Sequence, residues 1–363
     1  MPSFLALFAR RLLPWSVMCC AVGAADATVE LERTALVMGT EARVVVEAID
    51  RETAIEASEA AFAALNSTEA RLSSWRPESE LSRLAAASAG TAVEVSAATH
   101  AELLAAWRCA EETSGAFDPA IGPLSRAWGL RGGAPSRPSP ASLASALAAA
   151  DRGHFRLTAA DPRIGKMRSE AALDAGGFGK GAGLGRALEE LAAVPGVLAA
   201  TVDLGGQVAW WPLAERAASS VQIADPDARQ RPVVEAVVRD VTARGSVATS
   251  GNGSRGLSID GRRHGHLLDP RTGRPAPDFG SLTVFTADPL RADCLSTGLY
   301  VLGPEAALAW AKARVGVEVL VLERTHGGLP RVRATSGLEM KQPELLSAAV
   351  GRPELAASRA GGG

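Results

Sequence analysis

Hydrophobic positions along this chain recur at two different spacings, which predict two kinds of element. A helical spacing puts Ile55, Phe62 and Leu65 on one stripe of a predicted helix over residues 52–71. Further helices are predicted at residues 97–113 and 140–150, each preceded by a capping serine, and at residues 291–302 and 304–315. Strands are predicted where β-branched residues cluster, at residues 41–49, 199–211, 233–241, 245–249, 281–286 and 317–322. Because the connections in the middle of the chain are hairpin-like, the pattern predicts an α+β fold with a largely antiparallel sheet.

The first 27 residues have the features of an export signal. Arg10-Arg11 supplies a positive region, residues 12–21 are apolar, and the small residues between Ala21 and Ala27 offer cleavage sites. The apolar run is too short to cross a bilayer, and a buried helix is the alternative interpretation. We therefore expect a signal peptide at 1–27, a periplasmic domain at 28–345 and a disordered tail at 346–363.

Two adjacent cysteines within this signal raise the question of membrane attachment. Cys19 and Cys20 could carry a lipid, although Val17-Met18 is a poor match to the residues that precede a lipoprotein cysteine. A lipid anchor or an uncleaved signal would associate the protein with the inner membrane.

Charge and cysteine content argue against some classes of function. The formal net charge is −2 over 363 residues, so no nucleic-acid partner is expected through a basic surface. Outside the signal the chain has two cysteines, Cys109 and Cys294, without the paired spacing of a zinc site. A disulfide between these two remains open.

A glycine-rich loop precedes another predicted helix. Residues 173–181 read Leu-Asp-Ala-Gly-Gly-Phe-Gly-Lys-Gly, and apolar residues follow at Leu184, Leu188 and Leu191. Glycines at a helix start leave backbone amides free to bind an anion, and Lys180 adds positive charge. The spacing matches neither the Walker loop nor the dinucleotide fingerprint of a Rossmann fold. Tight packing of the loop would explain the glycines equally well.

A turn and a helix start lie close together in the sequence between His266 and Thr297. The turn reads His-Leu-Leu-Asp-Pro-Arg-Thr-Gly-Arg-Pro from residue 266 to 275, and its prolines and glycine have fixed backbone roles. His266 and Asp269 lie three residues apart and are candidates for proton transfer. Asp293 and Thr297 share one face of the predicted helix, and their oxygens suit Mg²⁺. Taken alone, the first half is also explained as a structural turn, and the second half as a helix N-terminus.

Trp75 is a candidate for binding a planar ring. It lies in a loop close to Pro77, and stacking of a ring on it would contribute about 1–3 kcal/mol by analogy with base stacking on aromatic side chains. A tryptophan buried in the core is the alternative, and the sequence does not separate the two.

Eight short motifs, taken in order, resemble those of the FAD:protein FMN transferases, the ApbE-type flavin transferases. They extend from about Val37 to about Glu323, nearly the whole predicted mature chain. The motifs are Met38-Gly39-Thr40, Ser74-Trp75 with Ser79-Glu80, Gly115-Ala116-Phe117-Asp118-Pro119 with Gly122-Pro123, Leu173-Asp174-x-Gly176-Gly177-x-x-Lys180-Gly181, Gly205-Gly206, Ala248-Thr249-Ser250-Gly251, His266-x-x-Asp269-Pro270-x-Thr272-Gly273-x-Pro275 and Ala292-Asp293-x-x-x-Thr297. No one motif is decisive, but eight in the family's order argue against coincidence.

The resemblance implies a fold and a reaction. The fold would be ApbE-like (T-fold-like), with largely antiparallel sheets flanked by helices in a single large domain that holds a cleft for FAD. The enzyme would depend on Mg²⁺, cut the pyrophosphate of FAD and move FMN to a threonine hydroxyl of a target protein, releasing AMP. The family's usual acceptors are subunits of membrane redox pumps and related electron-transfer proteins.

The resemblance also implies roles for individual residues. Asp293, Thr297 and the backbone carbonyl of Gly177 would hold Mg²⁺. His266 matches the family's functionally important histidine, and either His266 or an aspartate such as Asp269 would act on the threonine proton. The residues that would contact or surround FAD come from five of the motifs: Met38, Trp75, Ala116, Phe117, Asp118, Asp174, Lys180 and Leu267.

Five residues, at three places in the chain, depart from the family pattern. Phe178-Gly179 replaces a common isoleucine and alanine, Asn252-Gly253 replaces an acid and a tyrosine, and Ala85 replaces an asparagine. These changes bear on acceptor recognition or nucleotide affinity more than on metal binding. Two alternatives remain: an FAD pyrophosphatase that forms FMN and AMP with water as acceptor, and a periplasmic flavin-binding carrier without catalysis. The intact carboxylate–hydroxyl pair argues against the carrier.

Overall fold

A computed structural model describes residues 28–131, 134–212, 220–238, 244–253, 257–259, 262–325 and 329–341. The predicted signal peptide at 1–27 and the predicted tail at 346–363 lie outside these residues. None of the helices in the described ranges is both long enough and apolar enough to cross a membrane.

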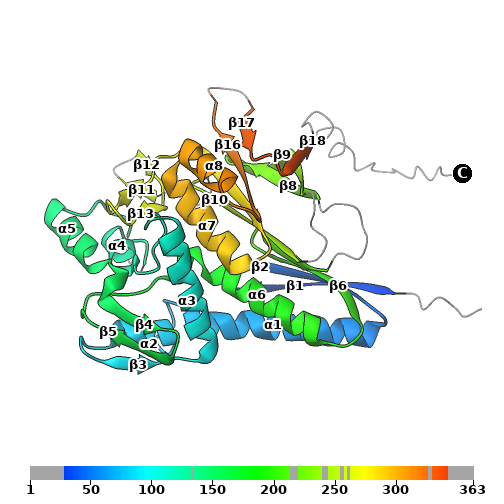
Figure 1. The fold of residues 1–363 in the computed structure, drawn as a ribbon, viewed down its shortest axis with the longest axis horizontal. Helices are drawn as coiled ribbons and strands as arrows, with labels where there is room; N and C mark the ends of the chain where they lie inside the picture. Colours follow the sequence, from blue (N-terminus) through cyan, green and yellow to red (C-terminus); the bar gives the residue numbers. More distant parts are fainter. Residues whose placement is uncertain are drawn as a thin grey trace, which may run out of the picture.

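An eight-stranded sheet, counted over the described residues, forms the centre of the molecule (Figure 1). Its strand order is β1-β2-β6-β7-β10-β15-β16-β17, and every neighbouring pair is antiparallel. The strands are β1 (Val29–Val37), β2 (Thr40–Ala48), β6 (Val197–Leu204), β7 (Gln207–Trp211), β10 (Gly245–Gly251), β15 (Gly280–Thr286), β16 (Val317–Glu323) and β17 (Arg331–Ala334). The predicted α+β fold with a largely antiparallel sheet is therefore confirmed.

The turn between β1 and β2 consists of only two residues, Met38 and Gly39. Val37 pairs with Thr40 across it, and the φ angles of Met38 and Gly39 are 53° and 70°. Two positive φ angles in a two-residue loop indicate a type I′ turn, whose twist suits a hairpin. Gly39 adopts this conformation without strain. Met38 is held in it, since its amide donates to Glu69 Oε2 at 3.2 Å.

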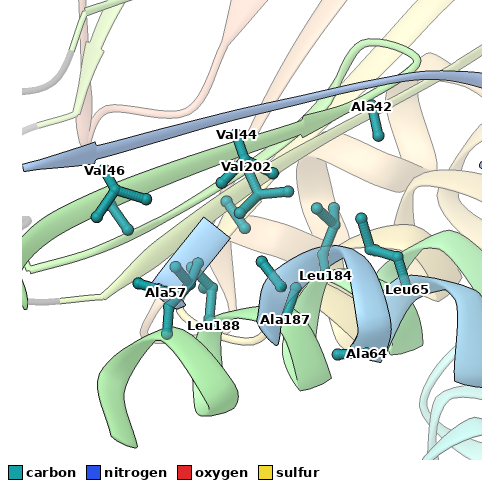
Figure 2. Packing of buried hydrophobic residues seen from close by; sticks show 14 of the residues in the cluster. Ala42, Val44, Val46, Ala57, Ala64, Leu65, Leu184, Ala187, Leu188 and Val202 are labelled. Carbon is teal, nitrogen blue, oxygen red and sulfur yellow. The ribbon is translucent and has the colours of Figure 1, made fainter. Parts of the chain in front are cut away.

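Helices cover one face of the central sheet. α1 (Arg51–Leu72) and α6 (Gly179–Ala193) lie against β1, β2 and β6, while α7 (Pro289–Leu302) and α8 (Pro304–Lys312) lie against β15 and β16 (Figure 1). Figure 2 shows aliphatic side chains filling the space between the first pair of helices and the sheet. Val44, Val46 and Val202 of the strands meet Leu184 and Leu188 of α6 there, all at most 1% exposed. Burial of this apolar surface holds the two layers together.

A second sheet, three-stranded within the described residues, covers part of the opposite face. Its order is β18-β9-β8, with β8 (Ser220–Asp225), β9 (Ala228–Val238) and β18 (Leu338–Lys341). Consecutive residues of β15 alternate between the two layers, since Val284 packs with the α7 side and Phe285 packs with Ile223 and Val234. The central sheet is therefore buried on both faces along β15 and β16.

The remaining elements form a lobe at one end of the helix layer (Figure 1). They include α2 (Glu80–Ala86), α3 (Ala97–Glu112), α4 (Gly122–Ala127), α5 (Pro140–Ala149), the sheet of β3 (Ala92–Glu94), β5 (Asp161–Lys166) and β4 (Phe155–Thr158), the short turns η1 (Arg152–His154) and η2 (Ala175–Gly177), and the hairpins β11 (Leu257–Ile259) with β12 (Arg262–His264) and β13 (Leu268–Asp269) with β14 (Arg274–Pro275). Ser96 and Ser139 cap α3 and α5 by accepting from the amides three residues onward, as predicted.

Of the stripe predicted for α1, Leu65 is fully buried, but the other two positions are not. Ile55 and Phe62 remain partly exposed, and half of the eight buried positions are alanines: Ala54, Ala57, Ala61 and Ala64. The reason is the close approach of α6, since a Cβ built on Gly183 would lie 3.2 Å from Leu65. Small side chains at such a contact let the two helices pack tightly, and the larger ones lie at its edge.

Candidate active site

The cavity that gathers most of the sequence motifs lies where α6, α7, β7 and β10 meet. It has a volume of about 360 Å³. Five predicted site residues line it: Lys180, His266, Leu267, Asp293 and Thr297. Four further segments contribute to the wall: Thr40, Gly205-Gly206, residues 249–251, and residues 221–226 at β8. Six of the eight motifs, widely separated in the sequence, therefore converge on one cavity.

Asp293 and Thr297 lie about one turn apart on α7, and both line the cavity. Asp293 is 4% exposed, and its Oδ2 accepts from the amide of Gly181 at 2.9 Å. Its Oδ1 lies 4.0 Å from Lys180 Nζ. Thr297 Oγ1 lies 3.5 Å from Ser250 Oγ on β10. The carboxylate is thus fixed at the first turn of α6, with one oxygen bonded to the backbone.

The backbone of Gly177 passes close to Thr297. A Cβ built on Gly177 would lie 3.2 Å from Thr297 Oγ1 and 3.1 Å from the ring of Phe117, so a side chain there would be crowded. A carboxylate, a hydroxyl and a backbone carbonyl are hard oxygen donors. Mg²⁺ in proteins is commonly held by one or two carboxylates together with substrate phosphates and water. The described residues contain no cluster of three His, Cys, Asp or Glu side chains able to hold a metal, but Mg²⁺ does not need one. This donor set therefore fits Mg²⁺.

Lys180 reaches the cavity from the first turn of α6. Its Nζ donates to Gln207 Oε1 at 3.4 Å, and Gln207 Nε2 donates to the carbonyl of Pro289 at 3.0 Å. Gln207 is 1% exposed. The glutamine therefore connects the lysine at the start of α6 to the start of α7.

Asp174 anchors the glycine-rich loop from outside the cavity. Its carboxylate accepts from the amide of Gly176 at 2.8 Å and from Arg131 Nε at 3.0 Å. Burial would raise the pKa of Asp174, but the Arg131 guanidinium and the Gly176 amide together hold that pKa below its ordinary value. Arg131 also lies 5.5 Å from the ring centroid of Trp75, which is 62% exposed. Trp75 is therefore not a core residue, and its ring is accessible to a planar group.

We expect Asp174→Asn to destabilise the fold, and to do so more at neutral than at acidic pH. The variant leaves Arg131 facing a neutral amide, and breaking a buried pair costs up to about 3–5 kcal/mol. The pKa of Asp174 is lower in the folded state than its ordinary value of 3.8. The carboxylate therefore stabilises the fold fully when the pH is above 3.8, and this stabilisation is lost as the pH falls through the folded-state pKa. The measurement is thermal unfolding of both proteins from pH 7 downward. If the difference in Tm between the wild type and Asp174→Asn does not decrease at low pH, the ion pair of Asp174 with Arg131 does not stabilise the fold in this way.

His266 and Leu267 reach the cavity from the segment before β13. Their backbone amides donate to Asn252 Oδ1 at 3.1 Å and 3.4 Å. Asp269 has different surroundings, since its Oδ1 accepts from the backbone amide and from Nε of Arg271, both at 2.9 Å. Within the described residues Asp269 does not line the cavity, and its contacts hold the β13–β14 turn. Of the two candidate bases, the geometry favours His266.

The other residues predicted to contact FAD do not line this cavity among the described residues. Phe117 lies against Gly177, and Met38 lies near Gly179, whose Cβ position is 3.7 Å from Met38 Cε. Ala116 is fully buried in the core beside α7. Asp118 is 9% exposed and bonds Arg152 at 3.1 Å, and burial raises its pKa. Met38 and Phe117 therefore support the glycine-rich loop, and their contact with FAD stays a prediction.

Cys109 and Cys294 are free, buried thiols in the same core cluster. The disulfide that the sequence left open is thus absent from the structure. Burial and the adjacent Cys109 thiol raise the pKa of Cys294, so this thiol stays protonated at neutral pH.

Gly181 lies where the start of α6 packs against the start of α7. A Cβ built on it would lie 2.3 Å from the carbonyl oxygen of Pro289 and 2.6 Å from Leu290 Cα. We expect Gly181→Ala to lower stability by about 1–3 kcal/mol, because backbone atoms would have to move. Gly185→Ala is the matched control, since nothing lies within 4 Å of a Cβ there, and alanine favours a helix by up to about 1 kcal/mol. Equal Tm values for the two variants would contradict this expectation.

The cavity also has polar lining residues that are not among the predicted site residues, and two of them, Gln207 and Ser250, form long-range hydrogen bonds. Gln207 bonds a residue 82 positions away, and Ser250 Oγ bonds Ser296 Oγ at 2.9 Å across 46 positions. Gln207 follows the Gly205-Gly206 motif and Ser250 lies within the motif at 248–251. In the sequence, the feature that could have identified these two residues is therefore their place within or directly after a motif.

Comparisons with known proteins agree with this geometry. The sequence profile of the ApbE family matches residues 38–321. A FAD:protein FMN transferase of Treponema pallidum (strain Nichols) is 32% identical over 326 residues, covering 85% of this chain and 88% of that protein. A FAD:protein FMN transferase of Vibrio cholerae serotype O1 is 31% identical over 270 residues, covering 73% of this chain and 79% of that protein.

Solved structures show the same likeness. The flavin transferase ApbE from Vibrio cholerae has a TM-score of 0.72 at 25% identity, covering 86% of this chain and 98% of that chain. The ApbE protein of Thermotoga maritima has a TM-score of 0.72 at 25% identity, covering 88% of this chain and 99% of that chain. The resemblance found in the sequence motifs and the ApbE-like fold are thereby confirmed. The chain belongs to the ApbE family.

Proposed function

We propose that this chain is an enzyme that transfers FMN from FAD to an acceptor protein. Relatives that align with most of its length are FAD:protein FMN transferases, which supports the same reaction here. The observation that carries the proposal is the single cavity shared by Asp293, Thr297, Lys180 and His266. Phosphoryl transfer needs these groups: oxygens for a cation, a positive charge near the phosphates and a candidate base.

The acceptor in this proposal is a threonine hydroxyl, and the product is a phosphoester. The threonine oxygen attacks the phosphorus of the FMN half of FAD. The bond from that phosphorus to the bridging oxygen breaks, and AMP leaves with the oxygen. The hydroxyl proton is released, and His266 is the cavity residue proposed to accept it.

The proposal also includes a requirement for Mg²⁺, with Asp293, Thr297 and the carbonyl of Gly177 as its protein donors. A cation bound there would supply positive charge to the pyrophosphate. Lys180 contributes a second positive charge from the start of α6, where Gln207 holds its ammonium group. The loop at Gly176 lies in the same wall and has the glycines that allow a phosphate to approach the backbone.

Covalent labelling of an acceptor protein tests this function. The mature chain is incubated with FAD, MgCl₂ and a flavin-accepting domain that carries a target threonine, and the proteins are separated on a denaturing gel. We expect a fluorescent acceptor band and AMP, and neither when EDTA is present. Replacing the acceptor's threonine by alanine should abolish the band. AMP and free FMN without labelled protein would instead identify a pyrophosphatase, and bound but uncut FAD would identify a carrier.

We also propose that the protein acts in the periplasm after export, on the basis of residues 1–27. The mature N-terminus should lie at residues 25–28 when periplasmic protein is sequenced. Lipid on Cys19 or Cys20 would instead place the protein in the membrane fraction with an increased mass. An intact Met1 on soluble cytoplasmic protein would overturn the proposal.

A further inference from the structure

We infer that Asn252 and Tyr300 are positioning residues that fix His266 relative to Asp293 and Thr297. The inference rests on the proposed flavin transfer, because the placement of His266 affects turnover only if His266 acts on the acceptor hydroxyl. It assigns Asn252 and Tyr300 no contact with FAD or with the acceptor.

Asn252 holds the segment that contains His266 by its backbone. The asparagine is 1% exposed, and its Oδ1 accepts from the amides of His266 and Leu267 at 3.1 Å and 3.4 Å. A Cβ built on Gly265 would lie 2.3 Å from Asn252 Nδ2, so the segment lies directly against the amide group. A single buried side chain therefore bonds the backbone at His266 and at Leu267.

Tyr300 connects Asn252 to α7. Its hydroxyl accepts from Asn252 Nδ2 at 3.0 Å and donates to Asp278 Oδ1 at 3.1 Å. The direction of both bonds is fixed, because the amide nitrogen can only donate and the ionised carboxylate can only accept. The ring of Tyr300 stacks on Phe279 with centroids 4.4 Å apart and an interplanar angle of 25°. The tyrosine therefore presents its hydroxyl to Asn252 in one defined orientation.

The same network is anchored at the ends of two central strands. Asp278, which precedes β15, forms an ion pair with Arg324, which follows β16. Arg324 also bonds both carboxylate oxygens of Asp227 at 2.8 and 2.9 Å, and its amide donates to the carbonyl of Phe279 at 2.8 Å. The orientation of Tyr300 is thus held by the central sheet as well as by its own helix.

α7 therefore contributes both to the proposed cation site and to the placement of the proposed base, His266. Tyr300 follows Thr297 by three residues on α7, so the two occupy neighbouring positions on the helix surface. Asp293 and Thr297 would hold the cation directly, whereas Tyr300 reaches His266 through Asn252. Misplacing a reacting group by about 1 Å can lower a rate about a hundredfold, so the network should affect turnover more than FAD affinity.

Asn252→Ala tests the inference, and Asn252→Asp is its conservative counterpart. Alanine removes the acceptor for both amides, so we expect kcat for transfer to fall about tenfold to a hundredfold with KM for FAD unchanged. Aspartate keeps the oxygen that accepts from both amides but loses the donor to Tyr300, so its kcat should lie between those of the wild type and Asn252→Ala. Tyr300→Phe keeps the stack on Phe279 but removes the hydroxyl, and should lower kcat by less than Asn252→Ala. Asn66→Ala is the control, because this exposed asparagine of α1 donates only to the carbonyl of Phe62 among the bonds described.

Amide hydrogen exchange provides a readout that does not depend on activity. Exchange in the peptide covering residues 265–268 should be faster in Asn252→Ala than in the wild type or Asn66→Ala, because the two amides lose their acceptor. If the wild type transfers no flavin, the proposed function fails while this measurement still tests the positioning. Unchanged exchange in Asn252→Ala, an unchanged kcat, or an Asn252→Asp variant as slow as Asn252→Ala would overturn the inference.

Discussion

We expect Asp293→Asn to lower Mg²⁺-dependent AMP release from FAD by about a thousandfold without unfolding the protein. Asparagine keeps an oxygen for the amide of Gly181, which donates to Asp293 Oδ2 at 2.9 Å, but it lacks the charge that would hold a cation. A bound metal supplies several kcal/mol to phosphoryl transfer, and about 4 kcal/mol corresponds to a thousandfold change in rate. The measurement is AMP release at saturating FAD over a series of Mg²⁺ concentrations.

Asp288→Asn is the matched control for this variant. Asp288 caps the same helix by accepting from the amides of Leu290 and Arg291 at 2.9 and 3.3 Å, and asparagine caps helices equally well. The control should therefore keep both its Tm and its rate near the wild-type values. If Asp293→Asn releases AMP as fast as this control does, Asp293 does not hold a metal.

The second large effect is expected for His266→Ala, which should lower flavin transfer by about a hundredfold to ten-thousandfold. The histidine is the candidate base that lines the cavity, whereas Asp269 is engaged with Arg271 in the neighbouring turn. Because His266 is assigned to the acceptor proton, binding of FAD should be nearly unchanged. Single-turnover transfer and an equilibrium FAD titration measure the two quantities separately.

His154→Ala serves as the control for His266→Ala. His154 lies in η1, outside the cavity, where its Nε2 bonds the carbonyl of Ala148 at 2.9 Å. This control should transfer flavin at the wild-type rate. A His266→Ala variant with the same rate would show that His266 only shapes the cavity wall, and weaker FAD binding would assign it to the nucleotide instead.

The sequence predicts best those helices and strands whose signal lies within a short stretch of the chain. Ser96 and Ser139 mark helix starts because each bonds an amide only three residues away. β16 is predicted from its apolar run, and the structure explains the run by burial on both faces. β1 has no comparable signal, since its residues alternate between exposed and half-buried at the edge of the sheet. Edge strands of this kind are missed because most of their surface faces water.

Long-range packing determines what the sequence does not predict. The alanine face of α1 follows from the approach of α6, which no periodicity within α1 alone reveals. The motifs predict that His266 and Asp293 share a site, but they do not reveal what holds the histidine in place. In the sequence Asn252 is only a departure from the family pattern. In the structure it bonds residues 14, 15 and 48 positions away.

The contact between Lys180 and Asp293 has a thermodynamic consequence for the order in which ligands bind. The ammonium lies 4.0 Å from Oδ1, the carboxylate oxygen that does not accept from Gly181. A cation held by Asp293 would compete with Lys180 for this carboxylate, and a pyrophosphate that attracts Lys180 would weaken the competition. Each ligand should therefore increase the affinity of the other by the same factor, so neither order of addition is obligatory. Titrating Mg²⁺ with and without FAD, and FAD with and without Mg²⁺, should give equal ratios of dissociation constants.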